Sequence, residues 1–158
     1  MFKDKVGVRG RVSYTLYDED GNIKKQSDSY NTATELQDAV LATMMHMGES
    51  STTGVGFIDC GTGTGGGASS TSLVTPITDS RIGISKATTA GGDDNDLVVT
   101  TTIPAGKFTA TIEEFGLFRD FETATMMYYD DNSASGHAIP KGASDTLAIT
   151  WTITYGAS

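Results

Sequence analysis

The sequence predicts a mainly β fold, an antiparallel β-sandwich of the jelly-roll or immunoglobulin-like kind, with one short α-helix packed on the sheet. Apolar and polar residues alternate in about eight short segments that are separated by turn-rich polar stretches. The chain contains 19 glycines and 3 prolines, together with many serines and threonines, which favours strands joined by turns. A single segment has the apolar spacing of a helix.

Length and composition indicate one domain. The chain has 158 residues, and 37% of them are hydrophobic, which is enough to bury one core without cross-links. No internal repeat or linker divides it. We therefore expect a single domain over residues 1–158, with an N-terminal arm at residues 1–5.

The first expected element is a β-hairpin over residues 11–30. Val12, Tyr14 and Leu16 alternate with polar neighbours, which is the period of a half-buried strand. Asp20-Gly21 then favours a tight turn, because these residue types tolerate the positive φ that such turns require. The return strand begins at Ile23.

The expected helix occupies residues 31–48. Thr32 has the position of an N-cap, with Glu35 completing a capping box, and Gly48 ends the helix. An apolar stripe follows the helical period and has to pack on a sheet. The stripe consists of Leu36, Val40, Met44 and Met47.

Further strands are expected after this helix, and the last of them has the clearest alternation, at Leu147, Ile149, Trp151 and Ile153. Polar turns are expected at residues 90–96 and 130–136. The expected strands lie within residues 55–61, 81–88, 96–104, 107–118, 125–130 and 145–155.

A glycine-rich segment follows the strand at 55–61. Gly61, Gly63 and Gly66 have the spacing G-x-G-x-x-G of a dinucleotide-binding turn. Such a turn works only where a helix begins inside it, and the residues after Gly66 are small, polar and without helical period. No lysine follows as in a P-loop. We therefore expect a flexible connection that is ordered by a neighbouring subunit.

Charge and cysteine content limit the partners. The net charge of −9 argues against nucleic acid and against an anionic membrane surface. The single cysteine, Cys60, cannot form an intrachain disulfide. No apolar run reaches the roughly 20 residues that span a bilayer, and the N-terminus lacks the apolar stretch of a secretory signal. We expect synthesis in a cytoplasm.

Few residues are candidates for catalysis. His46 lies on the expected helix and His137 in a polar loop, whereas Cys60 lies in an apolar strand, where a cysteine is usually a small core residue. A Cys–His pair made by the fold stays open. Glu113 and Glu114 are adjacent in a strand and face opposite sides, which argues against an acid–base couple. We expect no catalytic residue, no cofactor or metal site, and no enzyme.

Acidic residues form three clusters, and we interpret them as solvated loops, with weak calcium binding between subunits left open. The first is not an EF-hand, because Ile23 and Ser29 stand where that loop needs glycine and glutamate. The clusters are Asp18, Asp20 and Asn22; Asp93, Asp94 and Asp96; and Asp130, Asp131 and Asn132.

Four large side chains follow one another at residues 126–129. In a simple sandwich two of them face away from the core, which would favour an interface. In the alternative interpretation both faces are covered, one of them by the helix.

The order of motifs along the chain resembles a broad family of small virion structural proteins of tailed bacteriophages. That family has a "GTGT…T.L" segment, an "I.E.GLF" strand and a closing "I.KG..DTL.ITW.I" strand. One departure is Phe115, which is larger than the usual residue at its position. The matching residues are Gly61 to Thr64, Ser72-Leu73, Ile112, Glu114, Gly116 to Phe118, Ile139, Lys141-Gly142 and Asp145 to Ile153.

The resemblance implies a β-sandwich that is used repeatedly in a capsid or a tail. We expect a head decoration (cement) protein that bridges major capsid subunits and contacts copies of itself as a trimer. A tail, baseplate or fibre-attachment component is the first alternative. A carbohydrate-binding module is the second, and it would need Tyr128 or Tyr129 as an exposed aromatic platform, because Trp151 alternates with core residues.

Overall fold

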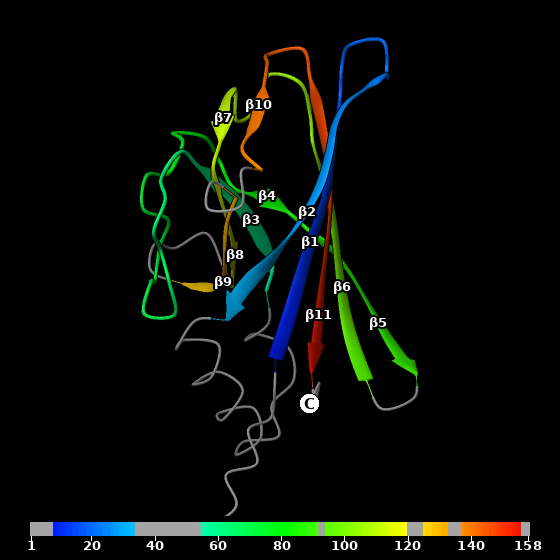
Figure 1. Ribbon diagram of the computed structural model, residues 1–158, viewed down its shortest axis with the longest axis vertical. Coiled ribbons are helices and arrows are strands. Elements are labelled where there is room, and N and C mark those ends of the chain that lie inside the picture. Colours follow the sequence, from blue (N-terminus) through cyan, green and yellow to red (C-terminus); the bar gives the residue numbers. More distant parts are fainter. Residues whose placement is uncertain (1–7, 34–54, 92–93, 120–124, 133–136, 156–158) are drawn as a thin grey trace, which may run out of the picture.

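The computed structural model describes residues 8–33, 55–91, 94–119, 125–132 and 137–155, and all regular structure within these ranges is β (Figure 1). Nine strands form one antiparallel sheet in the order β4-β3-β8-β9-β2-β1-β11-β6-β5, and β7 and β10 pair separately. The strands are β1 (Val8–Tyr17), β2 (Ile23–Ala33), β3 (Phe57–Gly61), β4 (Ile82–Gly83), β5 (Ser85–Gly91), β6 (Asp94–Ile103), β7 (Ala110–Ile112), β8 (Glu114–Phe118), β9 (Met126–Asp131), β10 (Ile139–Lys141) and β11 (Thr146–Tyr155).

The large sheet curves until its two edges meet. Strands β4 and β5 are the edges, yet only Ile84 separates them along the chain. The Thr101 hydroxyl of β6 donates a hydrogen bond of 3.2 Å to the Gly83 carbonyl of β4, which draws the edges together. The predicted mainly β, antiparallel fold is confirmed. The predicted two-sheet sandwich is not confirmed, because one nearly closed sheet encloses the core.

The predicted alternation places the core correctly. Val12 of β1 pairs with Trp151 of β11, and Leu16 pairs with Leu147, and all four side chains are buried. Burying each such side chain stabilises the fold by roughly 1.5–3 kcal/mol. The predicted Asp20-Gly21 turn is present, with Gly21 at φ 82°. Phe115, the departure noted above, is buried in the same core, with its ring centroid 6.4 Å from that of Tyr14.

The helix expected at residues 31–48 is not seen in the described residues, and its expected start lies in strand β2. Thr32 is a strand residue paired with Tyr129, so it is not an N-cap. The Asn31 side chain accepts a hydrogen bond of 2.8 Å from the Trp151 indole, which fixes the end of β2 against the core. The rest of the expected helix, with His46 on it, and the arm at residues 1–5 lie outside the described residues.

Strands β8 and β9 are covered on both faces. Met127 and Tyr128 pack in the main core, whereas Met126 and Tyr129 pack on the opposite face with Leu73 of the glycine-rich segment. All four residues at 126–129 are at most 3% exposed. These four side chains are therefore not free to form an interface. Met126 and Tyr129 are covered by the segment at residues 62–75, which lies beside β8 and β9 in Figure 1.

Candidate functional site

The glycine-rich segment is held by one buried carboxylate, which we call the Glu114 clamp. Glu114 is the first residue of β8 and is fully buried. Its Oε1 accepts hydrogen bonds from the backbone N–H groups of Gly63, at 3.1 Å, and Thr75, at 2.8 Å. Its Oε2 accepts a third from the Val74 N–H at 2.9 Å. The two ends of the segment are thereby joined through β8.

The amides between these ends also find acceptors within the protein. The Gly65 N–H donates to Asp131 Oδ2 at 2.7 Å, and the Gly66 N–H donates to the Tyr129 hydroxyl at 3.2 Å. The Gly67 N–H donates to Ser70 Oγ at 3.0 Å. These bonds give the segment internal support, so the expectation that a neighbouring subunit orders it stays a prediction that the structure does not require.

Close approach explains the G-x-G-x-x-G spacing. A Cβ on Gly61 would lie 2.2 Å from Glu114 Oε1, and a Cβ on Gly63 would lie 2.8 Å from the same atom. A Cβ on Gly66 would lie 2.5 Å from Cζ of Tyr129. These glycines let the backbone reach a carboxylate and an aromatic ring, and the donors that a phosphate would need already face the protein's own acceptors.

A second polar group is buried between β2 and β9, and we call Ser29, Asp130 and Asn132 the Asp130 cluster. Ser29 Oγ lies 2.7 Å from Asp130 Oδ2 and 3.3 Å from Asn132 Oδ1. Burial raises the pKa of Asp130 to about 7. The interpretation of Asp130 and Asn132 as part of a solvated loop is wrong, because both side chains are buried.

The candidate catalytic residues do not form a site. Cys60 is fully buried, which raises the pKa of its thiol well above the usual value. His137 lies elsewhere, with Nδ1 against the Ser27 hydroxyl and its carbonyl accepting from the Tyr14 hydroxyl. His46 is outside the described residues. Within the described ranges, no three His, Cys, Asp or Glu side chains converge as a metal would require.

In the other two acidic clusters, Asp18 and Asp96 accept hydrogen bonds from other groups of the protein. Asp18 Oδ1 accepts from the backbone N–H groups of Asp20, at 3.0 Å, and Asn22, at 2.8 Å, closing the first hairpin. Asp96 Oδ1 accepts from the Thr154 hydroxyl at 2.6 Å. Asp93 and the side chain of Asp94 lie outside the described residues. No helix in the described part of the chain is long and apolar enough to cross a membrane.

The outer face of β1, β2 and β11 carries an exposed aromatic residue that sequence analysis missed. Tyr30 is 81% exposed, because Ser29 points inward and the strand alternates. Its cross-strand neighbour is Arg11, whose Nε donates to Asp28 at 2.8 Å. A hollow of about 290 Å³ lies here, lined by Gly10, Arg11, Tyr30, Thr152 and Thr154. The exposure of Tyr30 could have been predicted by extending the alternation of the return strand as far as residue 30.

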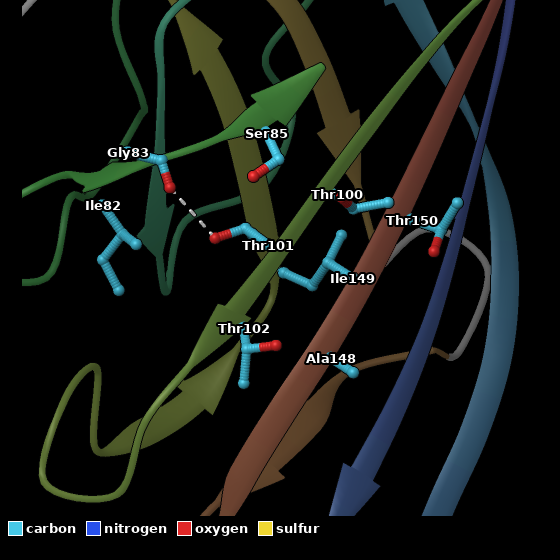
Figure 2. A pocket seen from close by; sticks show the side chains of 9 residues that line it. All are labelled: Ile82, Gly83, Ser85, Thr100, Thr101, Thr102, Ala148, Ile149 and Thr150. Carbon is cyan, nitrogen blue, oxygen red and sulfur yellow. Dashed lines mark hydrogen bonds between the residues drawn. The ribbon is translucent and has the colours of Figure 1, made fainter. Parts of the chain in front are cut away.

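A larger hollow of about 460 Å³ lies where the sheet closes. Figure 2 shows it between β4 and the neighbouring strands β6 and β11, with the Thr101–Gly83 hydrogen bond at its edge. Threonines and a serine supply most of its polar groups, and no ionisable side chain lines it. The lining consists of Ile82, Gly83, Ser85, Thr100, Thr101, Thr102, Ala148, Ile149 and Thr150.

Replacing the clamp carboxylate tests its role. Glu114→Gln turns one acceptor oxygen into an N–H₂ group that faces backbone donors, so we expect the free energy of unfolding to fall by roughly 2–4 kcal/mol. Proteolytic cleavage within residues 62–75 should also become faster. Glu113→Gln is the control, because in the described part of the chain Glu113 makes hydrogen bonds through its backbone alone. Equal stability and equal cleavage of the two variants would contradict the clamp.

Adjacent glycines provide a second test. Gly66→Ala places a methyl group against the Tyr129 ring, whereas the same methyl group at Gly67 meets nothing within 4 Å. We expect Gly66→Ala to lower the free energy of unfolding by about 1–3 kcal/mol, and Gly67→Ala to leave it within about 0.5 kcal/mol. Urea denaturation measures both. Similar losses in the two variants would show that close approach does not select glycine here.

Comparison with known proteins identifies no relative of this chain. No protein-family model, no curated protein and no solved structure matches it. Its function is therefore inferred from its own residues and their geometry.

Proposed function

We propose that this protein is a non-enzymatic virion structural protein of a tailed bacteriophage, and that it acts as a capsid decoration (cement) protein. It is made in the host cytoplasm and then binds the outer surface of the assembled head. There it bridges major capsid subunits and contacts its own copies, as a trimer. No cofactor takes part in this function.

The observation that carries the proposal is the contact between two motifs of the resemblance. Gly63 belongs to the "GTGT" motif and Glu114 to the "I.E.GLF" motif, 51 residues further along the chain, and the two are hydrogen-bonded at 3.1 Å. Short motifs of low complexity arise easily by chance. A buried carboxylate that joins two of them indicates that they form one structural unit, which supports the resemblance from which the function is proposed.

The closing motif also has a structural role. The Asp145 carboxylate accepts from the Gly142 N–H at 2.7 Å and pairs with the Lys24 ammonium at 2.7 Å. Trp151 lies in the core and is bonded to Asn31. The residues that match the family are thus those that hold the strands together, as expected of a shared fold rather than a shared reaction.

The outer face around Tyr30 is the contact surface that we propose. Tyrosine and arginine are the side chains most often found at the energetic centres of protein interfaces, and here Tyr30 and Arg11 are cross-strand neighbours on an exposed face. A decoration protein binds the assembled shell and not its separated subunits. It therefore stabilises the shell by mass action.

Tyr30 also gives the carbohydrate-binding alternative its required aromatic group. Tyr128 and Tyr129 are buried and cannot serve, whereas Tyr30 presents a ring beside the Arg11–Asp28 pair and Thr152. An aromatic face with planar hydrogen-bonding groups beside it is suited to a sugar ring. Binding on a glycan array that is lost in Tyr30→Ala would favour this function over the decoration of capsids.

Copy number separates a head protein from a tail protein. A decoration protein repeats over the capsid lattice, so we expect hundreds of copies in each particle. A tail, baseplate or fibre-attachment component would be present as a small multiple of three or six. Quantitative mass spectrometry of purified particles, together with cryo-EM of the head, measures this directly, and a small multiple would move the protein to the tail.

Substitution of Tyr30 tests the contact surface. Tyr30→Ala removes the exposed ring, and we expect occupancy on particles to fall about tenfold or more, as for a residue at the centre of an interface. The free energy of unfolding of the Tyr30→Ala protein should change little, because the ring is exposed in the free protein. Ile23→Ala is the matched control, an exposed apolar residue at the other end of β2. Equal occupancy of the two variants would place the contact elsewhere.

A further inference from the structure

The junction between β2 and β9 is short. The two strands share only the residue pairs Thr32 with Tyr129 and Ala33 with Tyr128 in the described part of the chain. This junction connects strands β1, β2, β11, β6 and β5 to strands β4, β3, β8 and β9. Side chains must therefore help to hold the two groups of strands together, and the Asp130 cluster lies beside this junction.

The Asp130 cluster leaves two buried atoms without a hydrogen-bond partner, Oδ1 of Asp130 and Nδ2 of Asn132. Asp130 is 1% exposed and Asn132 is fully buried, so water on the surface does not satisfy them. A buried polar atom without a partner destabilises the folded protein, and an ionised one does so more strongly. Such an atom in a folded protein therefore requires a physical explanation.

The hydrogen atoms of the cluster can be counted. The Ser29 hydroxyl has one hydrogen but lies beside two oxygens, Asp130 Oδ2 and Asn132 Oδ1. If the amide oxygen and nitrogen of Asn132 exchange places, its N–H₂ donates to Ser29 Oγ, and Ser29 donates to Asp130. The nitrogen then has a partner, the exchanged amide oxygen has none, and the charge of an ionised Asp130 is compensated by the Ser29 hydroxyl alone.

The groups around Asp130 offer it no positive charge. On β9 its neighbour Asp131 is acidic and raises the pKa of Asp130 further, although burial is the larger cause. On β1 the Tyr14 hydroxyl lies near enough for the Asp130 charge to act on it, and Asp28 of β2 acts on the same hydroxyl. On β8 Asp130 pairs with Phe115, and His137 contacts Ser27 and Tyr14 instead. No lysine or arginine of the described residues pairs with Asp130.

We propose that the Asp130 cluster is a proton-operated latch: with a proton on Asp130 the cluster holds β2 against β9, and loss of that proton loosens this junction. Protonation removes the uncompensated charge, so the buried cluster no longer holds an ionised group. Deprotonation leaves a carboxylate that is stabilised by one hydroxyl group alone. This inference does not depend on the proposed function, since it concerns the junction and no partner.

The direction of the pH dependence follows from the raised pKa. In the unfolded chain Asp130 releases its proton near pH 4, whereas in the folded protein its pKa is about 7. The stability that the bound proton contributes is complete below about pH 4 and is lost as the pH rises to about 7. The junction should therefore be closed in mildly acidic solution and looser in mildly alkaline solution.

Amide hydrogen exchange of the full chain tests the latch. We expect the protection factors of the amides paired between β2 and β9 to fall about tenfold for each pH unit between about pH 5 and about pH 7 and to become constant above that, so the change of slope has its midpoint near pH 7. The paired amides of β1 and β11 are the internal control and should stay unchanged. Fluorescence of Trp151, whose indole donates to Asn31 near the end of β2, gives a second readout of the same midpoint.

Substitutions distinguish the titration of Asp130 from that of neighbouring groups. Asp130→Asn cannot ionise and should remove the pH step, whereas His137→Gln should keep it. Ser29→Ala removes the hydrogen bond that favours the charged form, so its midpoint should move up by roughly half to one pH unit, which a purely structural role would not cause. This variant remains informative if Asp130→Asn does not fold.

Two results would overturn the proposal. One is a pH step that persists in Asp130→Asn or disappears in His137→Gln, because the titrating group would then be another. The other is recovery of protection by the wild-type protein at about pH 8.5 when about 5 mM CaCl₂ is added, because the unsatisfied oxygen would then belong to a cation site instead.

Discussion

The Glu114 clamp is the interaction on which the arrangement of this protein depends. A carboxylate at the start of β8 is buried without a lysine or arginine partner in the described residues, and three backbone amides stabilise its charge. Hydrogen bonds to an ionised acceptor are about twice as strong as neutral ones. They fix the path of a segment that has little apolar surface of its own, and they do so only because its glycines allow the close approach.

Once that segment is fixed, strand β9 can be apolar on both faces. Leu73 covers Met126 and Tyr129 on one side, while the barrel-like core covers Met127 and Tyr128 on the other. Tyr129 in turn accepts a hydrogen bond from Gly66, so its hydroxyl is satisfied where it is buried. The glycine-rich segment thus acts as a second layer over one part of a single sheet.

The acidic excess of the chain has a similar explanation. Asp79 accepts from the Phe108 N–H at 2.8 Å and pairs with the Lys107 ammonium at 2.6 Å, which holds Phe108 at the unfavourable φ of 49°. Asp59 pairs with Arg81, whose guanidinium lies 3.5 Å from the centre of the Phe118 ring. These carboxylates bind a backbone N–H group and the side chains of a lysine and an arginine. Part of the acidic content behind the net charge of −9 therefore stabilises the fold.

The elements that sequence analysis predicted correctly are those that depend on local pattern. The hairpin turn at Asp20-Gly21 and the buried face of β11 follow from residue type and period alone. The bounds of β2 were missed because Thr32 and Glu35 have the spacing of a capping box, and a long-range pairing with Tyr129 overrides that local preference. The burial of Asp130 and the cover over Met126 depend on which distant segments meet, and no single sequence states this.

The glycine-rich segment is held by hydrogen bonds within the protein. If the glycine-rich segment became ordered only on binding, its conformational entropy would be lost at that moment and would weaken association. Glu114, Asp131 and Tyr129 fix it during folding instead, so that loss is already part of the stability of the free protein. Strand β1, which carries Arg11, is likewise paired along its length with β11 and also with β2, which carries Tyr30. If this face is the proposed contact surface, its contacts contribute to binding with little loss of conformational entropy.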